Sequence, residues 1–383
     1  MQAFRLFSRD FYLTFAVNFT VYLIYYLTTI LCVEYAISEL GADIAEAGLA
    51  AGIFVFAGFA GRIIAGRLSL SLKNKTILYG GVFLSLISTL LYLMPVPIFV
   101  FVLIRFLHGV GFGLASNAAS AIAAILFPLK HRGEGLGYYM LSVTLATAAG
   151  PFLGLYLAQI TSYKNIFTLG MLLTLFALTA IYFIKAKENS SAPKHAGFSF
   201  ADFFEKSAVP MGLLGAVIGL CYAGVLNFLS PYLKEINSIS AGSYFYIVYA
   251  IFILLARPFI GRATDQKPHA VMIFLMLAFA VGMFIFSLAS SPMMALISAA
   301  FIGIGYGSFI SSAQAITIKA VQASRIAMAT STFLALFDIG MGAGSYLLGA
   351  LLSVINYHML YEILTLLILG CAGIYALFMR KSR

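Results

Sequence analysis

The sequence predicts an all-α integral membrane protein with twelve transmembrane helices, arranged as two pseudo-symmetric six-helix bundles. Three observations predict this fold class: the composition, the spacing of long apolar segments, and a repeat of motifs between the two halves of the chain. Of the 383 residues, 62% are hydrophobic and only 9% are charged. Soluble proteins carry about 25% charged residues. The composition therefore excludes a soluble domain, a disordered chain and a secreted disulfide scaffold.

Twelve apolar segments are long enough to cross a bilayer, whose hydrocarbon core requires about 20 helical residues. We predict helices near residues 11–33, 44–66, 76–94, 98–126, 136–158, 166–184, 209–231, 244–262, 270–289, 293–318, 327–354 and 360–379. The first segment is too long for a signal-peptide core and is followed by Glu34 instead of a small-residue cleavage site. We therefore expect it to be a true membrane helix.

Basic residues lie mostly on one side of these segments. Of the 23 Lys and Arg residues, all but Arg105, Lys164 and Lys234 fall in the terminal segments or in alternate loops on that side. Because Lys and Arg concentrate in cytoplasmic loops, both termini are predicted to be cytoplasmic. We expect a multi-pass protein of the cell inner (plasma) membrane. The net charge of +10 is then a signal of topology, and we expect no nucleic-acid partner.

The longest polar stretch predicts the domain organisation. We expect an N-terminal six-helix bundle at 1–184, a cytoplasmic linker at 185–207 and a C-terminal six-helix bundle at 208–383.

The two halves also resemble each other in sequence. The segment HGVGFG at 108–113 matches GIGYG at 303–307, and GRIIAGRLSL at 61–70 matches ARPFIGRATD at 256–265. Two halves of equal topology are typical of transporters whose bundles rock around a central site.

Three motifs resemble those of the major facilitator superfamily, and the resemblance covers nearly the whole chain. The first is the family pattern Gly-x-x-x-Asp-Arg-x-Gly-Arg-Arg after the second helix. Leu70 replaces its acidic residue in the first half, whereas Asp265 keeps it in the second. The resemblance implies a gating role, and the alternative is a purely topological charge. The gating candidates here are Gly66, Arg67, Gly261, Arg262 and Asp265.

The second motif, Arg105-Phe-Leu-His108-Gly-Val-Gly, resembles the family pattern Arg-x-x-Gln/His-Gly-x-Gly. An unpaired arginine this deep in a membrane costs at least about 2.5 kcal/mol, so Arg105 must face protein or water. The resemblance implies that Arg105 tunes a nearby proton site, and the alternative is a structural hydrogen bond. His108 is a second proton-coupling candidate, because no other histidine lies inside a span. A histidine satisfied within the core is the alternative.

The third motif comprises Gly137, Gly150, Pro151 and Gly154 in the fifth helix, with Ala146 in place of one glycine. It resembles the superfamily's exporter signature, which implies proton-driven efflux of a drug or metabolite. Small residues at every fourth position make one flat helix face, and the proline bends the helix. The alternative is ordinary packing of small residues.

Two carboxylates complete the proton-coupling candidates. Asp338 lies near the middle of the eleventh span, where a lone carboxylate is expected to be protonated or paired. It is a candidate carrier of the coupling proton, and a structural ion pair is the alternative. Glu34 closes the first span, and its alternative is a solvated helix end.

Uncharged polar groups concentrate on the first, fourth, seventh and tenth helices, which line the central cavity in this superfamily. Such a cavity suits amphiphilic or neutral solutes. The candidates for substrate contact are Asn18, Tyr22, Tyr25, Asn117, Tyr222, Asn227, Tyr306 and Gln314.

These features predict a secondary active transporter, and no enzymatic activity is expected. We expect export of a small organic compound or drug by proton antiport through alternating access. The alternative is proton-coupled uptake, by symport, of a sugar or other small metabolite. The expected partners are the solute, protons and the lipid bilayer, and the protein is expected to be a monomer. No cofactor or metal is expected, because the three cysteines lie far apart in apolar segments.

Overall fold

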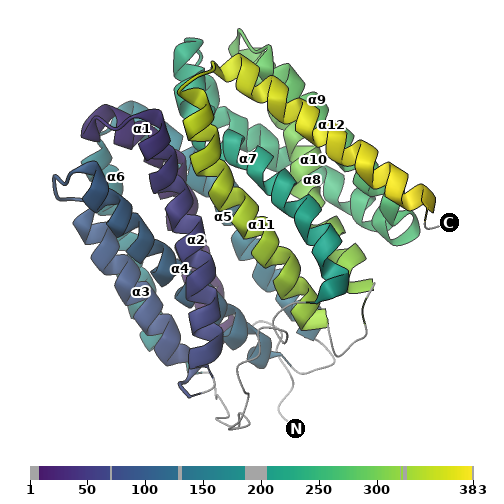
Figure 1. Cartoon of the computed structure of the whole chain (residues 1–383). Coiled ribbons are helices and arrows are strands. Elements are labelled where there is room, and N and C mark those ends of the chain that lie inside the picture. The colour runs from purple at the N-terminus through teal and green to yellow at the C-terminus, as the bar shows by residue number, and fades with distance from the viewer. Residues whose placement is uncertain are drawn as a thin grey trace. The chain divides into compact units, whose positions relative to one another are not determined.

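The structure is a computed structural model, and it describes residues 8–69, 71–127, 132–185, 205–319, 321 and 326–381. These residues are almost entirely helical and contain no strand. Figure 1 shows the helices, whose bounds are α1 (Arg9–Leu40), α2 (Ile44–Leu68), α3 (Asn74–Leu91), α4 (Ile98–Leu126), α5 (Arg132–Ile160), α6 (Tyr163–Tyr182), α7 (Val209–Glu235), α8 (Ser240–Gln266), α9 (Pro268–Ser287), α10 (Pro292–Lys319), α11 (Ile326–Leu352) and α12 (Tyr357–Lys381).

All 12 of these described helices contain a segment long and apolar enough to cross a membrane. The predicted all-α membrane fold is therefore confirmed. Most helices begin and end within a few residues of the predicted bounds, but α1 continues to Leu40 instead of ending near Glu34. The helix ends at Gly41, whose φ of +66° is a left-handed conformation that glycine adopts without steric penalty.

The chain groups into two compact units. Unit 1 contains Met1–Leu31 and Ile53–Ala196, and unit 2 contains Cys32–Gly52 and Gly197–Arg383. The last turns of α1 and the first turns of α2 therefore group with the helices of the second half. The division of the chain at a 185–207 linker stays a prediction, because most of that stretch lies outside the described residues.

Glycines of α4 bring the helices of unit 1 into close contact. A Cβ at Gly109 or Gly113 would overlap a backbone carbonyl oxygen of α2, at Phe54 or Gly58 respectively. A Cβ at Gly111 would instead lie 2.8 Å from the carbonyl oxygen of Gly81 in α3. Small residues let helix backbones approach in this way inside a membrane.

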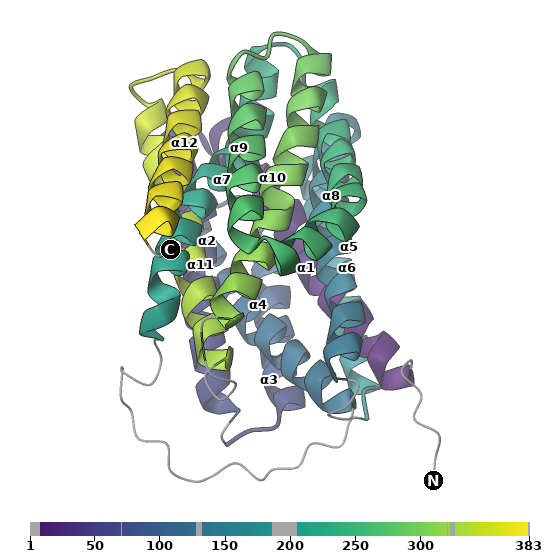
Figure 2. The ribbon, with the colours of Figure 1, turned by 90° about the vertical axis from the view of Figure 1, so that its right-hand side faces the viewer.

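The corresponding glycines of α10 repeat this arrangement in unit 2. A Cβ at Gly303 would lie 2.5 Å from the carbonyl oxygen of Tyr249 in α8, and one at Gly305 would lie 2.7 Å from that of Leu275 in α9. Figure 2 shows α10 beside α9. The motif repeat seen in the sequence thus corresponds to the same packing role in each unit.

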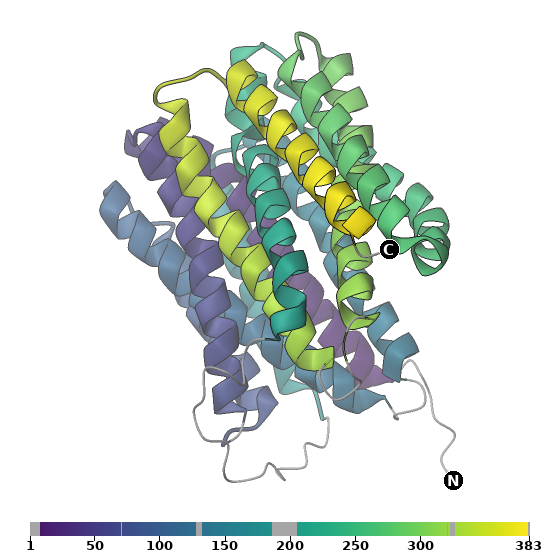
Figure 3. The same ribbon diagram turned by 45° about the vertical axis from the view of Figure 1, so that its right-hand side comes forward.

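The fifth helix of each half packs on the first by the same means. A Cβ at Gly150 in α5 would lie 2.6 Å from the Cβ of Tyr26 in α1, and one at Gly344 in α11 would lie 2.8 Å from the Cα of Leu220 in α7. Figure 3 shows α11 running alongside α7. These two contacts set the distance between α1 and α5 and the distance between α7 and α11. They therefore set how near the polar side chains of α1 and α7 lie to the facing helix.

Gly305→Ala tests this packing, with Gly370→Ala as its control. The new methyl group at Gly305 meets the backbone of α9, so the helices must separate, which we expect to lower the free energy of unfolding by about 1–3 kcal/mol. Gly370 in α12 has no neighbour within 4 Å, so alanine there is expected to gain up to about 1 kcal/mol of helix propensity. Thermal unfolding in detergent measures both, and equal melting temperatures for the two variants would contradict the packing argument.

Candidate functional site

Arg105 is fully enclosed by protein in unit 1, with only 1% of its surface exposed. Its guanidinium donates hydrogen bonds to the hydroxyls of Thr28 and Thr29 on α1, each at 3.3 Å. The guanidinium carbon also lies 4.4 Å from the ring centre of Phe54 on α2, which is a cation–π geometry. Arg105 thus faces protein and is hydrogen-bonded there, whereas its role in proton coupling stays a prediction.

His108 lies one helical turn after Arg105 and shares Phe54 with it. Its ring meets the Phe54 ring edge-on, with 5.1 Å between the ring centres. Its Nδ1 lies 3.1 Å from the hydroxyl oxygen of Tyr92, and the side chain is buried. The histidine is thus hydrogen-bonded within the core, next to a permanently charged group. We call these four residues, Arg105, His108, Phe54 and Tyr92, the Arg105 cluster.

Glu34 has partners on α7, within unit 2. Its carboxylate accepts a hydrogen bond from the Ser230 hydroxyl and lies 3.6 Å from the ammonium group of Lys234. The glutamate side chain is 13% exposed and the lysine side chain 64% exposed. The alternative reading of a solvated helix end therefore does not describe this structure. The sequence held one signal for the pairing, because Lys234 is one of only two basic residues predicted on that side of the membrane.

The end of α7 holds Lys234 in position. The N–H of Asn237 donates to the carbonyl oxygen of Lys234 at 3.2 Å, and that of Ser238 donates to Leu233 at 2.7 Å. Asn237 has a positive φ of 51°. Together these features form a Schellman motif, which closes the last turn of a helix.

Asp338 lies in the middle of α11, twelve residues after Ile326 and thus about 18 Å along the helix axis. It is partly buried. The ring of the preceding residue, Phe337, is inclined by 28° to the ring of Tyr306 on α10, with 6.4 Å between the ring centres. Asp338 therefore lies well away from both ends of its helix.

Aromatic candidates for substrate contact stack within each unit. In unit 2, Tyr222 of α7 and Tyr306 of α10 stack face to face, with ring centres 3.5 Å apart. In unit 1, Tyr25 stacks on Phe112 at 4.8 Å, and Tyr22 meets the same ring edge-on at 5.1 Å. The structure therefore brings the first and fourth helices of each half together through these rings.

The two asparagine candidates are buried between helices. The amide nitrogen of Asn18 donates to the Ser142 hydroxyl on α5 at 2.8 Å. The amide nitrogen of Asn227 donates to the Ser345 hydroxyl on α11 at 2.9 Å. Each amide thus links the first and fifth helices of its own half, and a contact with substrate stays a prediction. Asn117 and Gln314 are partly exposed.

The gating candidates are exposed in the described part of the chain. Gly66, Arg67, Gly261 and Arg262 all have exposed surfaces, and a Cβ on either glycine would meet nothing within 4 Å. Close helix contact in this part of α2 occurs at Gly61, where a Cβ would lie 2.5 Å from the Val110 carbonyl oxygen. Of the remaining candidates, Gly150, Pro151 and Gly154 lie within α5, and the side-chain surroundings of Gly137 and Asp265 fall outside the described residues.

A polar pocket of about 190 Å³ lies between α8 and α10 in unit 2. Arg257 lines it from α8, and Ser308, Ser311 and Ser312 line it from α10. The Ser308 hydroxyl is buried without a hydrogen-bond partner in the described structure. The Ser311 hydroxyl donates to the carbonyl oxygen of Ser308 at 3.0 Å, so the Ser308 hydroxyl is the lining hydroxyl best placed to meet an acceptor group of a solute. Sequence reasoning had assigned Arg257 only to membrane topology.

Comparison with known proteins identifies the family. The model of the Major Facilitator Superfamily matches residues 14–237 and 211–383. An uncharacterised MFS-type transporter of Methanocaldococcus jannaschii is 24% identical over 332 residues, which cover 84% of this chain and 86% of that protein. The multi-drug resistance efflux pump PmrA of Streptococcus pneumoniae is 28% identical over 142 residues, which cover 37% of this chain and 32% of the pump.

Solved structures show the same fold. A POT family transporter in complex with a thioalcohol-conjugated peptide has a TM-score of 0.80 at 15% identity, covering 97% of this chain and 96% of that chain. The nucleoside transporter NupG has a TM-score of 0.74 at 14% identity, covering 95% of this chain and 99% of that chain. At these identities the likeness concerns the fold alone.

Thr29→Val tests whether α1 holds Arg105, and Thr174→Val is the control. Valine keeps the shape of threonine but removes the acceptor, so we expect unfolding to become easier by about 1–2 kcal/mol. Thr174 is equally buried, but its hydroxyl donates to Gly170 of its own helix at 2.7 Å. Thermal unfolding in detergent compares the two variants. If Thr29→Val is as stable as Thr174→Val, the hydrogen bond to the arginine contributes nothing.

Proposed function

The chain belongs to the major facilitator superfamily, and from that premise we propose that it exports a small organic compound or drug from the cytoplasm in exchange for protons. It is a multi-pass membrane transporter and not an enzyme. The proposed site of action is the inner (plasma) membrane. Export proceeds by alternating access, in which the solute site opens to one side of the membrane at a time.

The position of Asp338 carries the proposal of proton coupling. A carboxylate about 18 Å along a membrane helix is expected either to be protonated or to be paired, because a lone charge in hydrocarbon is expensive. Protonation from the acidic outer side and release to the cytoplasm would alternate these two conditions. That alternation couples the proton gradient to the direction in which the solute site opens.

The packing of α5 on α1 supports export as the direction. The α5 face that resembles the exporter signature contacts α1 directly at Gly150, and again at Gly154, where a Cβ would lie 2.8 Å from a methyl carbon of Ile30. A face of small residues allows one helix to move against another without steric obstruction. The partial similarity to an efflux pump favours the same direction.

We assign separate roles to the other candidates. The Arg105 cluster holds a fixed positive charge on α4 and tunes the proton site. Glu34, Ser230 and Lys234 fasten the end of α1 to α7. Tyr222 and Tyr306 are buried and stack on each other, so we assign them to the contact between α7 and α10. The pocket at Arg257 can accept the polar group of the solute.

Asp338→Asn tests the proposal in inverted membrane vesicles whose interior is acidified and followed with a pH-sensitive dye. A panel of amphiphilic drugs, sugars and amino-acid-like metabolites is added in turn. We expect at least one compound to raise the interior pH in the wild type and none to do so in the variant, since asparagine cannot exchange a proton. Glu362→Gln, which removes an exposed carboxylate from α12, is the control and is expected to respond like the wild type.

Two results would contradict this proposal. A full dye response from correctly folded Asp338→Asn would remove this residue from proton coupling. If no compound moves protons in inverted vesicles, but a radiolabelled sugar or metabolite accumulates in right-side-out vesicles with the gradient, uptake replaces export.

Glu34→Gln and Lys234→Gln separate a proton-carrying carboxylate from a merely paired one. Because the lysine side chain is 64% exposed, its ion pair is worth less than about 1 kcal/mol, so Lys234→Gln is expected to slow export by no more than about fivefold. Glu34→Gln keeps the hydrogen-bond acceptor for Ser230 but removes the titratable group. A larger loss for Glu34→Gln, measured as initial export rate, supports proton coupling at Glu34. Equal effects of the two variants would leave Glu34 with a structural role alone.

A further inference from the structure

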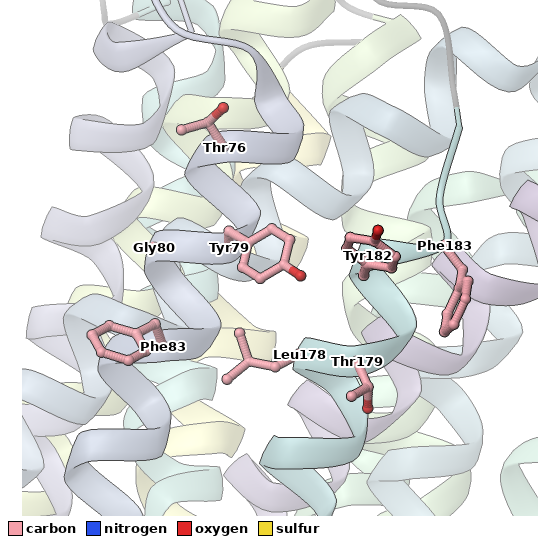
Figure 4. A pocket seen from close by; sticks show the side chains of 8 residues that line it. All are labelled: Thr76, Tyr79, Gly80, Phe83, Leu178, Thr179, Tyr182 and Phe183. Atoms are coloured by element: carbon pink, nitrogen blue, oxygen red, sulfur yellow. The ribbon is translucent and has the colours of Figure 1, made fainter.

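An aromatic groove of about 710 Å³ lies on the surface of unit 1, between α3 and α6. Figure 4 shows the side chains of both helices around it, with Tyr79 and Tyr182 facing each other across the gap. The proposed transport function does not use this groove. Gly80 forms part of its wall, and a Cβ there would meet nothing within 4 Å.

The chemistry of the groove changes with depth. Thr76 lies two residues after the start of α3, whereas Phe83 lies nine residues after it, about 10 Å deeper along the axis. The hydroxyls of Thr76 and Tyr79 are therefore near the helix end, and Phe83 and Leu178 form the deeper part. Phe83 is 55% exposed, so the groove offers an apolar surface at membrane depth.

Basic groups surround the shallow end of the groove. Lys73 immediately precedes α3 and is exposed, and Lys185 follows α6 by three residues and is also exposed. The guanidinium carbon of Arg9 lies 5.7 Å from the ring centre of Phe183, which lines the groove. Asp10 is an acidic group at this end, and its carboxylate accepts a hydrogen bond from the backbone N–H of Lys185 at 3.1 Å.

Lys75 joins the two walls of the groove at this end. Its ammonium group donates to the carbonyl oxygens of Tyr182 at 3.0 Å and of Ile184 at 2.6 Å. A lysine in this position satisfies carbonyls at the end of α6 that have no partner within the helix. Arg9, Lys73, Lys75 and Lys185 thus stand against Asp10, so the charged groups named at the shallow end of the groove are mostly basic.

We propose that this groove binds one anionic glycerophospholipid. The acyl chain lies along Phe83 and Leu178, the glycerol and ester region meets the hydroxyls of Thr76 and Tyr79, and the phosphate lies near Lys73 and Lys185. A lipid of this class has the same order of charge, polar and hydrocarbon segments as the groove. Basic pockets at the membrane surface bind anionic headgroups, and each lysine contributes about a fivefold preference.

The absence of tryptophan from the sequence makes a direct test available. Phe83→Trp places a single indole in the groove, and Leu178→Trp reports on the same groove from α6. Each variant is reconstituted in nanodiscs of phosphatidylcholine that contain a small fraction of brominated lipid, which quenches indole fluorescence on contact. The quencher is brominated phosphatidylglycerol in one series and brominated phosphatidylcholine in the other.

Phe274→Trp is the matched control, because Phe274 lies six residues into α9 and is also 55% exposed. We expect the phosphatidylglycerol series to quench the groove indoles at a several-fold lower lipid fraction than the phosphatidylcholine series. The control is expected to show the same quenching with both lipids. Replacing Lys73 and Lys185 with Gln should remove most of this preference, because each lysine is expected to contribute about fivefold to it.

Equal quenching of the groove indoles by the two lipids would overturn the proposal. So would a preference for phosphatidylglycerol that is as strong at Phe274→Trp, or one that survives the replacement of both lysines. Lys75 stays unchanged in every variant, because its bonds to α6 hold the groove together. Loss of lipid preference in a protein that still responds in the dye assay separates this proposal from that of proton-coupled export.

Discussion

Close contact between helix backbones is the constraint on which this structure depends. Inside a bilayer, apolar side chains gain little by leaving lipid for protein, so helices associate through tight packing and interhelical hydrogen bonds. Glycines of α4 and α10 make that packing possible on two sides at once. The functional candidates are carried by the same helices, because His108 directly precedes Gly109 and Tyr306 directly follows Gly305. A substitution that separates the helices at these glycines would therefore also displace His108 and Tyr306.

The twelve helices and the repeat between halves could be predicted from the sequence, because hydrophobic length and motif spacing are properties of the chain itself. The end of α1 could not. Glu34 resembles a helix terminus when read alone, yet its partners Ser230 and Lys234 belong to a helix 196 residues away. Because this carboxylate is paired, the helix can continue past it to Leu40. The helix ends there because Gly41 adopts a positive φ.

The sequence indicated which residues belong to the candidate site, but it did not indicate which groups those residues contact. The depth of Arg105 required a partner, but only the fold shows that α1 supplies two threonine hydroxyls and α2 a phenylalanine ring. Asn18 and Asn227 were candidates because they are polar residues on the first and seventh helices. The sequence could not tell whether such a side chain faces a cavity or another helix. Tyr79 and Tyr182 were equally ambiguous, since aromatic residues are abundant throughout this chain.

The fastening of α6 also has a mechanical meaning. The chain leaves α6 through Tyr182, Ile184 and Lys185, and these backbone groups are bonded to Lys75 at the start of α3 and to Asp10 at the start of α1. Tension arriving through the following segment would be shared among three helices before it could unwind the last turn of α6. Unit 1 would then resist such a pull through α1, α3 and α6 together.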